Sequence, residues 1–511
     1  MSTSNLAAAN MTLPQEQGWG LPVLVLVSGM FMSVLDSSIV NVAVPTIEHT
    51  FGATTQQVAW IVTAYALSLG VIMPLSAWLA NRFGATRVYC YALLAFGAAS
   101  ALCGVAWDLN SLILFRVLQA IPGGLLPPLS MAILYRIVPP GEIGRAMGMY
   151  GLGVVVAPAI GPALGGYLVE YIDWRLIFFI NVPIGLAAAF ATLKILPNFP
   201  PSGRPKFDFF GFVTSATGLF ALLLALSEGA SWGWASFRVV SLVCFALIML
   251  SLFIVIELEV DQPLLDVRVF RYLQCAVSLV LVSVLAIGMF TALFYVPVFL
   301  QNAQRMGAFD AGMLLLPQAI GMAVVMPIAG RVYDLYGPRW PAVIGLLVCA
   351  YGSLMLHHLQ IDTPRHELTL ILTLRAAGMG LAFMPAMTAA LASVPPALTS
   401  SASAFNNVFQ QASASFGLAV LGAVLTTTTA QFTADRAALI TPDTPLPDLG
   451  PGPAGETLSL YATYVITTTT AFVDALNNVM VLLAILSLLG AALALLLRRP
   501  DSESGPFVAM H

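Results

Sequence analysis

Three charged residues, Asp36, Arg116 and Arg375, lie inside long apolar segments of this 511-residue chain. Asp36 lies in FMSVLDSSIVNVAVP, and Arg116 lies in LILFRVLQA. A charged side chain is costly in hydrocarbon, so such residues usually have a function there. At about 1.5 Å per helical residue, Asp36 lies roughly 8 Å and Arg116 roughly 10 Å from the same edge of a core about 30 Å thick. We therefore expect the two side chains to face each other across a cavity.

A carboxylate beside a guanidinium in a partly buried site can carry a proton. Burial disfavours a charged carboxylate and a guanidinium favours it, so a carboxyl group between these effects can titrate as its exposure changes. The pair predicts that Asp36 binds a proton on one side of the membrane and releases it on the other. Protonation would loosen the hold on Arg116. A static buried pair that only fixes helix packing is the alternative.

Motifs for other chemistry are missing from the sequence. Neither lysine lies in a GxxxxGK[ST] loop, and the chain has no HExxH, GxSxG or metal-spaced Cys/His cluster. The histidines His357, His358 and His366 share one short loop, which favours a solvated loop over a metal site. A membrane enzyme would place histidine or paired acids centrally in a span, and a proton-translocating respiratory subunit would carry several such residues in series. The sequence predicts no enzyme, no metal and no cofactor; an ion gradient or the solute's own gradient would supply the energy.

The composition indicates a polytopic protein of the lipid bilayer. Hydrophobic residues make up 59% of the chain and charged residues 9%, against roughly a quarter charged in soluble proteins. This excludes a soluble fold, a nucleic-acid binder and a disordered chain. The long, continuous apolar segments favour helices over a barrel. We expect fourteen transmembrane helices, at about 21–45, 56–80, 86–106, 109–136, 142–169, 174–196, 209–228, 236–256, 271–300, 308–331, 338–357, 366–393, 400–426 and 474–498.

Cations and an internal repeat divide the chain. With the N-terminus inside, most Lys and Arg residues fall in cytoplasmic loops, which predicts that both termini are cytoplasmic. The segments Pro74–Gly84 and Pro327–Gly337 resemble each other, so we expect two six-helix halves, with Met289 at the position of Asp36. The predicted organisation is a tail (1–20), a first half (21–200), an inserted helix pair (201–262), a second half (263–498) and a tail (499–511).

The last outer loop, at 427–473, differs in composition from the others. It contains Thr426 to Thr429, TPDTPLPDLGPGPAG and Thr467 to Thr470, and it is longer than structureless loops usually are. The composition suits either a flexible tether or a docking surface for a partner outside the membrane.

The predicted helix at 142–169 is rich in glycine and proline. These residues either kink a membrane helix or let another backbone approach closely. Two interpretations follow: dense helix packing, or a bend against the opposite half that seals the cavity. The residues concerned are Gly153, Pro158, Gly161, Pro162, Gly165 and Gly166.

Polar and aromatic residues of several spans could line a substrate cavity. Two Asn-to-Gln pairs in the helix at 400–426 are i,i+4 neighbours on a helix face, which suits either cavity lining or interhelical hydrogen bonding. A cavity with a single carboxylate suits neutral, lipophilic or cationic compounds. The candidates are Asn41, Trp60, Tyr65, Gln119, Tyr150, Tyr295, Arg375, Asn406, Asn407, Gln410 and Gln411.

Five segments of the chain carry a family resemblance. They are LDSSIVNVAVP, LANRFGATR, LILFRVLQA, GPALGG and WRLIFFINVPIG. Together they resemble the fourteen-helix drug:proton antiporters of the major facilitator superfamily (EmrB/QacA type), and the resemblance covers nearly the whole chain. The run GPALGG has the form of that group's antiporter motif. The resemblance implies export, with Asp36 as proton carrier and Arg116 as its coupling partner.

The resemblance also implies a cytoplasmic gate built from two loops. The chain departs from the family at Asn81, where an acid is usual, and at Ala77, where glycine is usual, so Asp334 is expected to carry more of the latch. The arginines either take part in the gate or only orient the chain in the membrane as cytoplasmic cations. The gate candidates are Asn81, Arg82, Gly84, Arg87, Gly330, Arg331, Asp334, Gly337 and Arg339.

The combined prediction is proton-driven multidrug efflux across a bacterial cytoplasmic (inner) membrane. Hydrophobic or amphipathic toxic compounds would leave as protons enter, by alternating access. An exporter or symporter of one specific metabolite on the same fold is the alternative. In a Gram-negative cell, a periplasmic membrane-fusion adaptor and an outer-membrane channel would be partners, and no nucleic acid would be.

Overall fold

The computed structural model describes residues 18–201, 206–439 and 453–499, and every regular element in these ranges is helical. Short turns and four short 3-10 helices join the α-helices. The α-helices are α1 (Gly20–Phe51), α2 (Thr55–Ile72), α3 (Leu75–Phe83), α4 (Ala85–Gly104), α5 (Leu109–Ile137), α6 (Ile143–Tyr171), α7 (Leu176–Phe179), α8 (Asn181–Ile195), α9 (Phe209–Trp232), α10 (Phe237–Glu259), α11 (Leu273–Asn302), α12 (Ala308–Tyr336), α13 (Arg339–Met355), α14 (Arg365–Ala392), α15 (Thr399–Ala438) and α16 (Pro453–Ala494).

The number of spans agrees with the sequence prediction. In the described ranges, 13 helices are long and apolar enough to cross a membrane, and the number reaches 14 when one bent pair counts as a single span. That pair is α2 and α3, which meet at an angle of 55°. The break falls at Met73 and Pro74, where proline cannot donate the amide hydrogen bond that a continuous helix needs. The all-helical polytopic fold is confirmed.

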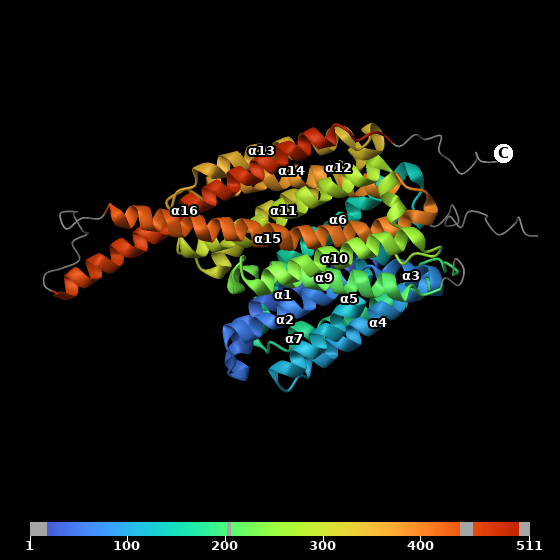
Figure 1. The fold of residues 1–511 in the computed structure, drawn as a ribbon, viewed down its shortest axis with the longest axis horizontal. Helices are drawn as coiled ribbons and strands as arrows, with labels where there is room; N and C mark the ends of the chain where they lie inside the picture. Colours follow the sequence, from blue (N-terminus) through green and yellow to red (C-terminus); the bar gives the residue numbers. More distant parts are fainter. Residues whose placement is uncertain (1–17, 202–205, 440–452, 500–511) are drawn as a thin grey trace, which may run out of the picture.

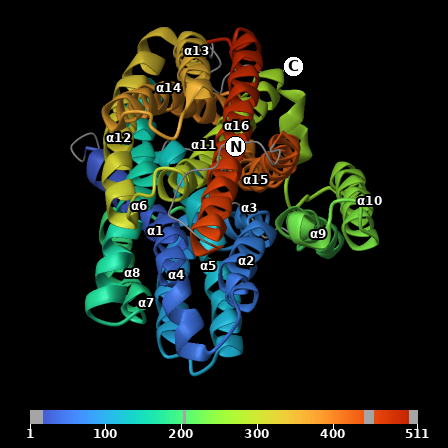
Figure 2. The same ribbon diagram turned by 90° about the vertical axis from the view of Figure 1, so that its left-hand side faces the viewer.

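The spans form two six-helix halves and one inserted pair (Figures 1 and 2). In the first half α1 packs against α5, α6 and α8, and in the second half α11 packs in the same way against α14, α15 and α16. The inserted helices α9 and α10 pack against each other, and α9 also lies against α2 and α15. Figure 2 shows this pair at the edge of the molecule. It therefore connects the two halves along one flank.

The apolar core joins the halves on one side of the molecule only. We call the side where α1 begins and α16 ends the terminal side, and the side where α1 and α15 end the far side. One large cluster of buried residues, reaching the terminal side, draws on both halves and includes Met147 and Met326. Toward the far side the first half has its own cluster around Ile39, and the second half has its own around Phe299. The two halves thus share a core near the terminal side and have separate cores near the far side.

The expected outer loop at 427–473 is largely helical. The helix α15 continues to Ala438 and α16 begins at Pro453, and both extend beyond the bundle in Figure 1; residues 440–452 lie outside the described ranges. The prediction of a structureless tether is wrong for 427–438 and 453–473. Threonine side chains compete with helix formation unless they bond to the preceding turn. Here they do so: the Thr429 and Thr433 hydroxyls donate to carbonyls four residues earlier at 2.7 and 2.8 Å.

Candidate functional site

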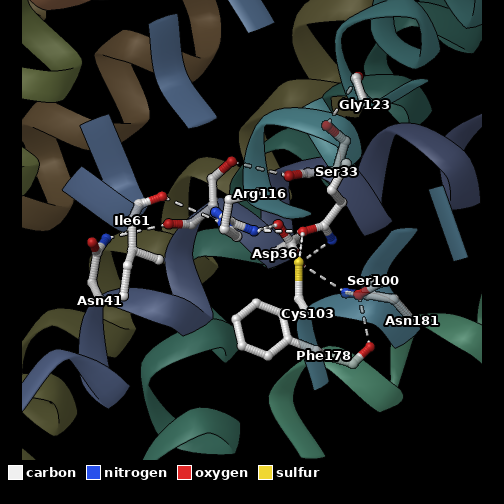
Figure 3. Close-up of polar contacts among 12 residues, drawn as sticks. Ser33, Asp36, Asn41, Ile61, Ser100, Cys103, Arg116, Gly123, Phe178 and Asn181 are labelled. Carbon is white, nitrogen blue, oxygen red and sulfur yellow. Dashed lines mark hydrogen bonds and ion pairs between the residues drawn. The ribbon is translucent and has the colours of Figure 1, made fainter. Parts of the chain in front are cut away.

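The two charged residues at depth meet inside the first half (Figure 3). Asp36 of α1 and Arg116 of α5 are both fully buried, and Arg116 Nη1 donates to Asp36 Oδ2 at 2.5 Å. An ion pair removed from water is tolerated only with good geometry and further hydrogen bonds. The surroundings of this pair therefore decide what it can do.

Two amide side chains complete the shell around Asp36. Gln119 Nε2 and Asn181 Nδ2 each donate to Asp36 Oδ1 at 2.8 Å, and Gln119 Oε1 accepts from Arg116 Nη1 at 2.8 Å. Asn181 Nδ2 also donates a hydrogen bond to Ser100 Oγ at 3.1 Å. The carboxylate thus accepts hydrogen bonds from α5 and α8 while it is carried by α1, so its charge ties three helices together.

The Arg116 guanidinium is also held by α2. Its Cζ lies 3.7 Å from the centre of the Tyr65 ring, and its Nε donates to the Ile61 carbonyl at 3.4 Å. A desolvated cation over an aromatic face is worth about 2 kcal/mol. The guanidinium can therefore stay in place on α2 when its contact with Asp36 weakens.

Asn181, Ser100 and Cys103 belong to the site but were not predicted as site residues. Asn181 begins α8 directly after the short helix α7, and Cys103 Sγ donates to Gln119 Oε1 at 3.4 Å. A signal for Asn181 existed, because it is a polar residue among apolar neighbours in the predicted span at 174–196. Ser100 and Cys103 carried no comparable signal, since both side chains pack readily in any membrane helix.

The glycine- and proline-rich part of α6 packs beside Asp36, within the first half. A Cβ atom on Gly161 would lie 2.6 Å from Ser38 Oγ, and one on Gly165 would lie 2.8 Å from Ile39 Cγ1. The Ser38 hydroxyl donates to the Pro158 carbonyl at 3.4 Å. These contacts support dense packing of α6 on α1. The helix α6 also packs against α12 of the opposite half, and the alternative, a bend of this run that seals the cavity, stays a prediction.

Earlier glycines of α6 make the contact with the second half instead. A Cβ atom on Gly144 would lie 2.2 Å from the Gly330 carbonyl oxygen of α12. Asp334 of α12 accepts from the backbone N–H groups of Gly144 and Arg145 at 2.8 and 3.0 Å. A carboxylate at a helix N-terminus is favourable because the unpaired amides there carry partial positive charge. Asp334 therefore latches the two halves together on the terminal side.

The other gate candidates make no hydrogen bond between the two halves among the described residues. Gly84 and Gly337 have φ of 91° and 78°, a region that favours glycine. Arg339 Nε donates to the Leu497 carbonyl at 2.7 Å. Within the described part of the chain, the Asn81 side chain makes no hydrogen bond, so the first loop has no counterpart of the Asp334 latch. The partly or fully exposed members are Asn81, Arg82, Arg87, Arg331 and Arg339.

Arg375 of α14 lies in the second half without a carboxylate. It is buried, its Nε donates to Ser353 Oγ at 3.0 Å, and its Nη2 donates to the Gly288 carbonyl at 2.7 Å. Among the described residues no acidic side chain lies within 4.0 Å of its nitrogens. Gly288 directly precedes Met289, the residue that the repeat places at the position of Asp36.

The remaining cavity candidates fall into two groups. Tyr150 is buried with its hydroxyl 3.1 Å from Ser130 Oγ. Asn406 Nδ2 contacts Met131 Sδ at 3.9 Å across the two halves, and Asn407 donates to a carbonyl of its own helix. These three are therefore packed between helices in this conformation and do not line an open cavity. The partly or fully exposed candidates are Asn41, Trp60, Tyr295, Gln410 and Gln411.

Comparison with known proteins agrees with this architecture. The family model for the Major Facilitator Superfamily matches residues 26–418. An uncharacterized MFS-type transporter of Bacillus subtilis is 37% identical over 80% of this chain and 76% of its own length. A multidrug resistance protein B homolog of Mycobacterium tuberculosis is 32% identical over 79% of this chain and 75% of its own length.

A solved structure shows the same fold at low sequence identity. The proton:xylose symporter XylE aligns over 91% of this chain and 94% of its own, with a TM-score of 0.60 and 12% identity. At this identity the likeness concerns the fold alone. The family match, the relatives and the two-half helical architecture lead to one conclusion: this chain belongs to the major facilitator superfamily of membrane transporters.

Proposed function

We propose that this transporter exports hydrophobic or amphipathic toxic compounds in exchange for protons. The observation that carries the proposal is the buried Asp36–Arg116 pair, whose hydrogen bonds join α1, α5 and α8. A relative at 32% identity that is named for multidrug resistance supports export of drugs. No cofactor is required, because a proton gradient supplies the free energy.

Protonation of Asp36 changes the forces between helices. As a carboxylate, Asp36 attracts Arg116 and accepts from Gln119 and Asn181. A proton on Oδ2 removes the charge attraction and leaves the guanidinium against Tyr65 and the Ile61 carbonyl of α2. The tie between α1 and α5 is then weaker, which favours the rearrangement that exposes the site to the other side. Release of the proton restores the pair.

Loop charges propose which side of the molecule faces the cytoplasm, and the shared core indicates which side is closed in this conformation. We place the terminal side in the cytoplasm of a bacterial cell, because the loops on that side carry most of the Lys and Arg residues. The Asp334 latch and the shared core then close the cytoplasmic side, while the separate cores allow opening on the far side. In a Gram-negative cell, a periplasmic adaptor and an outer-membrane channel would carry the compound onward.

Transport into everted membrane vesicles tests the proposal. We expect Asp36→Asn to abolish ethidium uptake driven by a pH gradient, because the side chain can no longer exchange a proton. Asp310→Asn, which removes an exposed carboxylate at the start of α12, is the matched control and should retain uptake. Unchanged gradient-driven uptake in Asp36→Asn would show that Asp36 is not the proton carrier.

A further inference from the structure

Two buried carboxyl groups lie at the terminal end of the inserted pair, away from the Asp36 site. Asp208 precedes the first turn of α9 and is 8% exposed, and Glu257 lies in the last turn of α10 and is 0% exposed. Acidic side chains are almost never buried this deeply without a partner. Nothing in the proposed transport cycle requires them.

The two carboxyl groups lie together beside Gly211. A Cβ atom on Gly211 would lie 2.2 Å from Asp208 Oδ2 and 2.8 Å from Glu257 Oε1, so both oxygens approach the same point. Asp208 Oδ1 accepts from the Gly211 N–H at 2.8 Å. Asp208 Oδ2 is buried and has no hydrogen-bond partner among the described residues. The Asp208 oxygen that lacks a donor is thus the one that shares the space beside Gly211 with Glu257 Oε1.

No described cation balances the two groups. Asp266 of the following segment is a further acidic neighbour of Glu257, and its Oδ1 lies 3.9 Å from Arg268 Nε. Glu257 accepts from the Leu265 N–H, at 3.3 Å to each oxygen, and from the neighbouring Leu264 N–H. The other described charged residues of this region, Lys206, Glu259 and Asp261, are exposed. Two neighbouring carboxylates cannot both stay ionised in such a place.

The helix geometry indicates which group keeps its charge. Asp208 caps the N-terminus of α9, where unpaired backbone amides stabilise a negative charge. Glu257 lies near the C-terminus of α10, where a negative charge is disfavoured. The proton therefore belongs on Glu257.

We propose that Glu257 holds a proton and donates it in a hydrogen bond to Asp208 Oδ2, which makes the pair a proton-binding site separate from Asp36. This bond joins α9 to α10 and fixes the segment that follows α10. In that segment the Asp266 N–H donates to Ser401 Oγ of α15 at 3.2 Å. Loss of the proton would set two negative charges against each other and loosen the connection between the inserted pair and the second half.

Infrared spectroscopy of the purified protein in lipid nanodiscs tests the assignment. At neutral pH we expect the absorption band of a protonated carboxylic acid. The part of this band that comes from Glu257 should be lost in Glu257→Gln and retained in Asp36→Asn. Arg204→Gln controls for a cation from outside the described ranges, and it should leave the band unchanged. A spectrum of Glu257→Gln identical to that of the wild type would overturn the proposal, as would a new band that arises only in Arg204→Gln.

Thermal unfolding as a function of pH gives a second readout. The folded protein holds a proton that the unfolded chain releases at neutral pH, so stability falls as pH rises. Glu257→Gln keeps the neutral hydrogen bond and should remove this part of the slope, whereas Asp36→Asn should keep it. If the two variants have the same slope as the wild type, or if Mg²⁺ stabilises the wild type but not Glu257→Gln, the pair holds no proton and the proposal fails. The result does not depend on transport, so it is independent of the role proposed for Asp36.

Discussion

The two halves each bury one arginine at a related position, but only the first half gives it a carboxylate. Arg116 meets Asp36, Gln119 and the face of Tyr65. Arg375 meets a serine hydroxyl and a backbone carbonyl, which are neutral acceptors. Of these two surroundings, only that of Arg116 contains a group that can change its charge by binding a proton.

The difference assigns unequal tasks to two similar scaffolds. In the proposed mechanism, one proton on Asp36 of the first half would weaken the attraction between α1 and α5. In the second half, the contact between α14 and α11 is made through the Gly288 carbonyl and stays the same whatever the proton concentration. In the proposed mechanism the repeat would supply two halves that move against each other, and the difference between Asp36 and Met289 would make only the first half respond to protons.

Removing the buried arginine of each half should give the largest difference in stability between the two halves. Arg116→Gln leaves a buried carboxylate without its cation, and breaking such a pair costs about 3–5 kcal/mol. Arg375→Gln removes a buried cation that has only neutral partners, so we expect a clearly smaller loss. Thermal unfolding in detergent measures both. Equal losses would contradict the view that the ion pair distinguishes the halves.

A double variant isolates the pair itself. Asp36→Asn together with Arg116→Gln removes both charges, so it should recover much of the stability that Arg116→Gln loses. Gradient-driven transport should stay absent, because no titratable carboxyl group remains at the Asp36 site. Recovery of transport in the double variant would mean that another residue carries the proton.

Exchange of each arginine for lysine should give the next largest effect. Lysine keeps the charge but cannot stack flat on Tyr65 while it donates to Asp36, Gln119 and the Ile61 carbonyl. We expect Arg116→Lys to lower the initial rate of ethidium uptake by about tenfold or more, an estimate based on roughly 1.4 kcal/mol for each tenfold change. Arg375→Lys should lower it less. Equal rates for the wild type and Arg116→Lys would show that only the charge matters.

Loss of Asn181 should have a moderate effect. Asn181→Ala removes a donor to the buried Asp36 and costs about 1–3 kcal/mol of stability. Asn41→Ala is the control, because Asn41 is exposed and donates only to the Ser37 carbonyl of its own helix. Its effect should fall within about 0.5 kcal/mol. If both variants unfold at the same temperature, the contact from α8 contributes nothing measurable.

Glycine substitutions should give the most local differences. Gly161→Ala pushes α6 away from α1 beside Asp36, and Gly417→Ala pushes α15 away from Ile287, whose Cγ2 lies 2.9 Å from the added Cβ position. Both should lose about 1–3 kcal/mol from overpacking. Only Gly161→Ala should also slow transport. Gly166→Ala is the control, since its nearest neighbour lies 4.0 Å away; a loss there as large as at Gly161 would contradict the packing argument.

Much of the site could be predicted from depth along the predicted helices. Counting residues from the helix ends brought Asp36 and Arg116 to the same level, and the structure puts them in contact. Asn181 escaped the prediction because a single asparagine in a span is as consistent with helix packing as with a site. The loop at 427–473 escaped it because threonine and proline are typical of loops, and the hydroxyl bonds that stabilise α15 form only once the helix exists.

The sequence by itself determined the membrane class, the number of spans, the two halves and the three charges at depth, because hydrophobic length and charge placement act locally along the chain. The tertiary structure alone decided which polar side chains surround each charge. It also decided that the glycine run of α6 packs on α1 while Gly144 meets Gly330, and that Asp208 and Glu257 both lie beside Gly211. These relations depend on how helices far apart in sequence rotate and approach one another, and periodicity within one helix does not determine that.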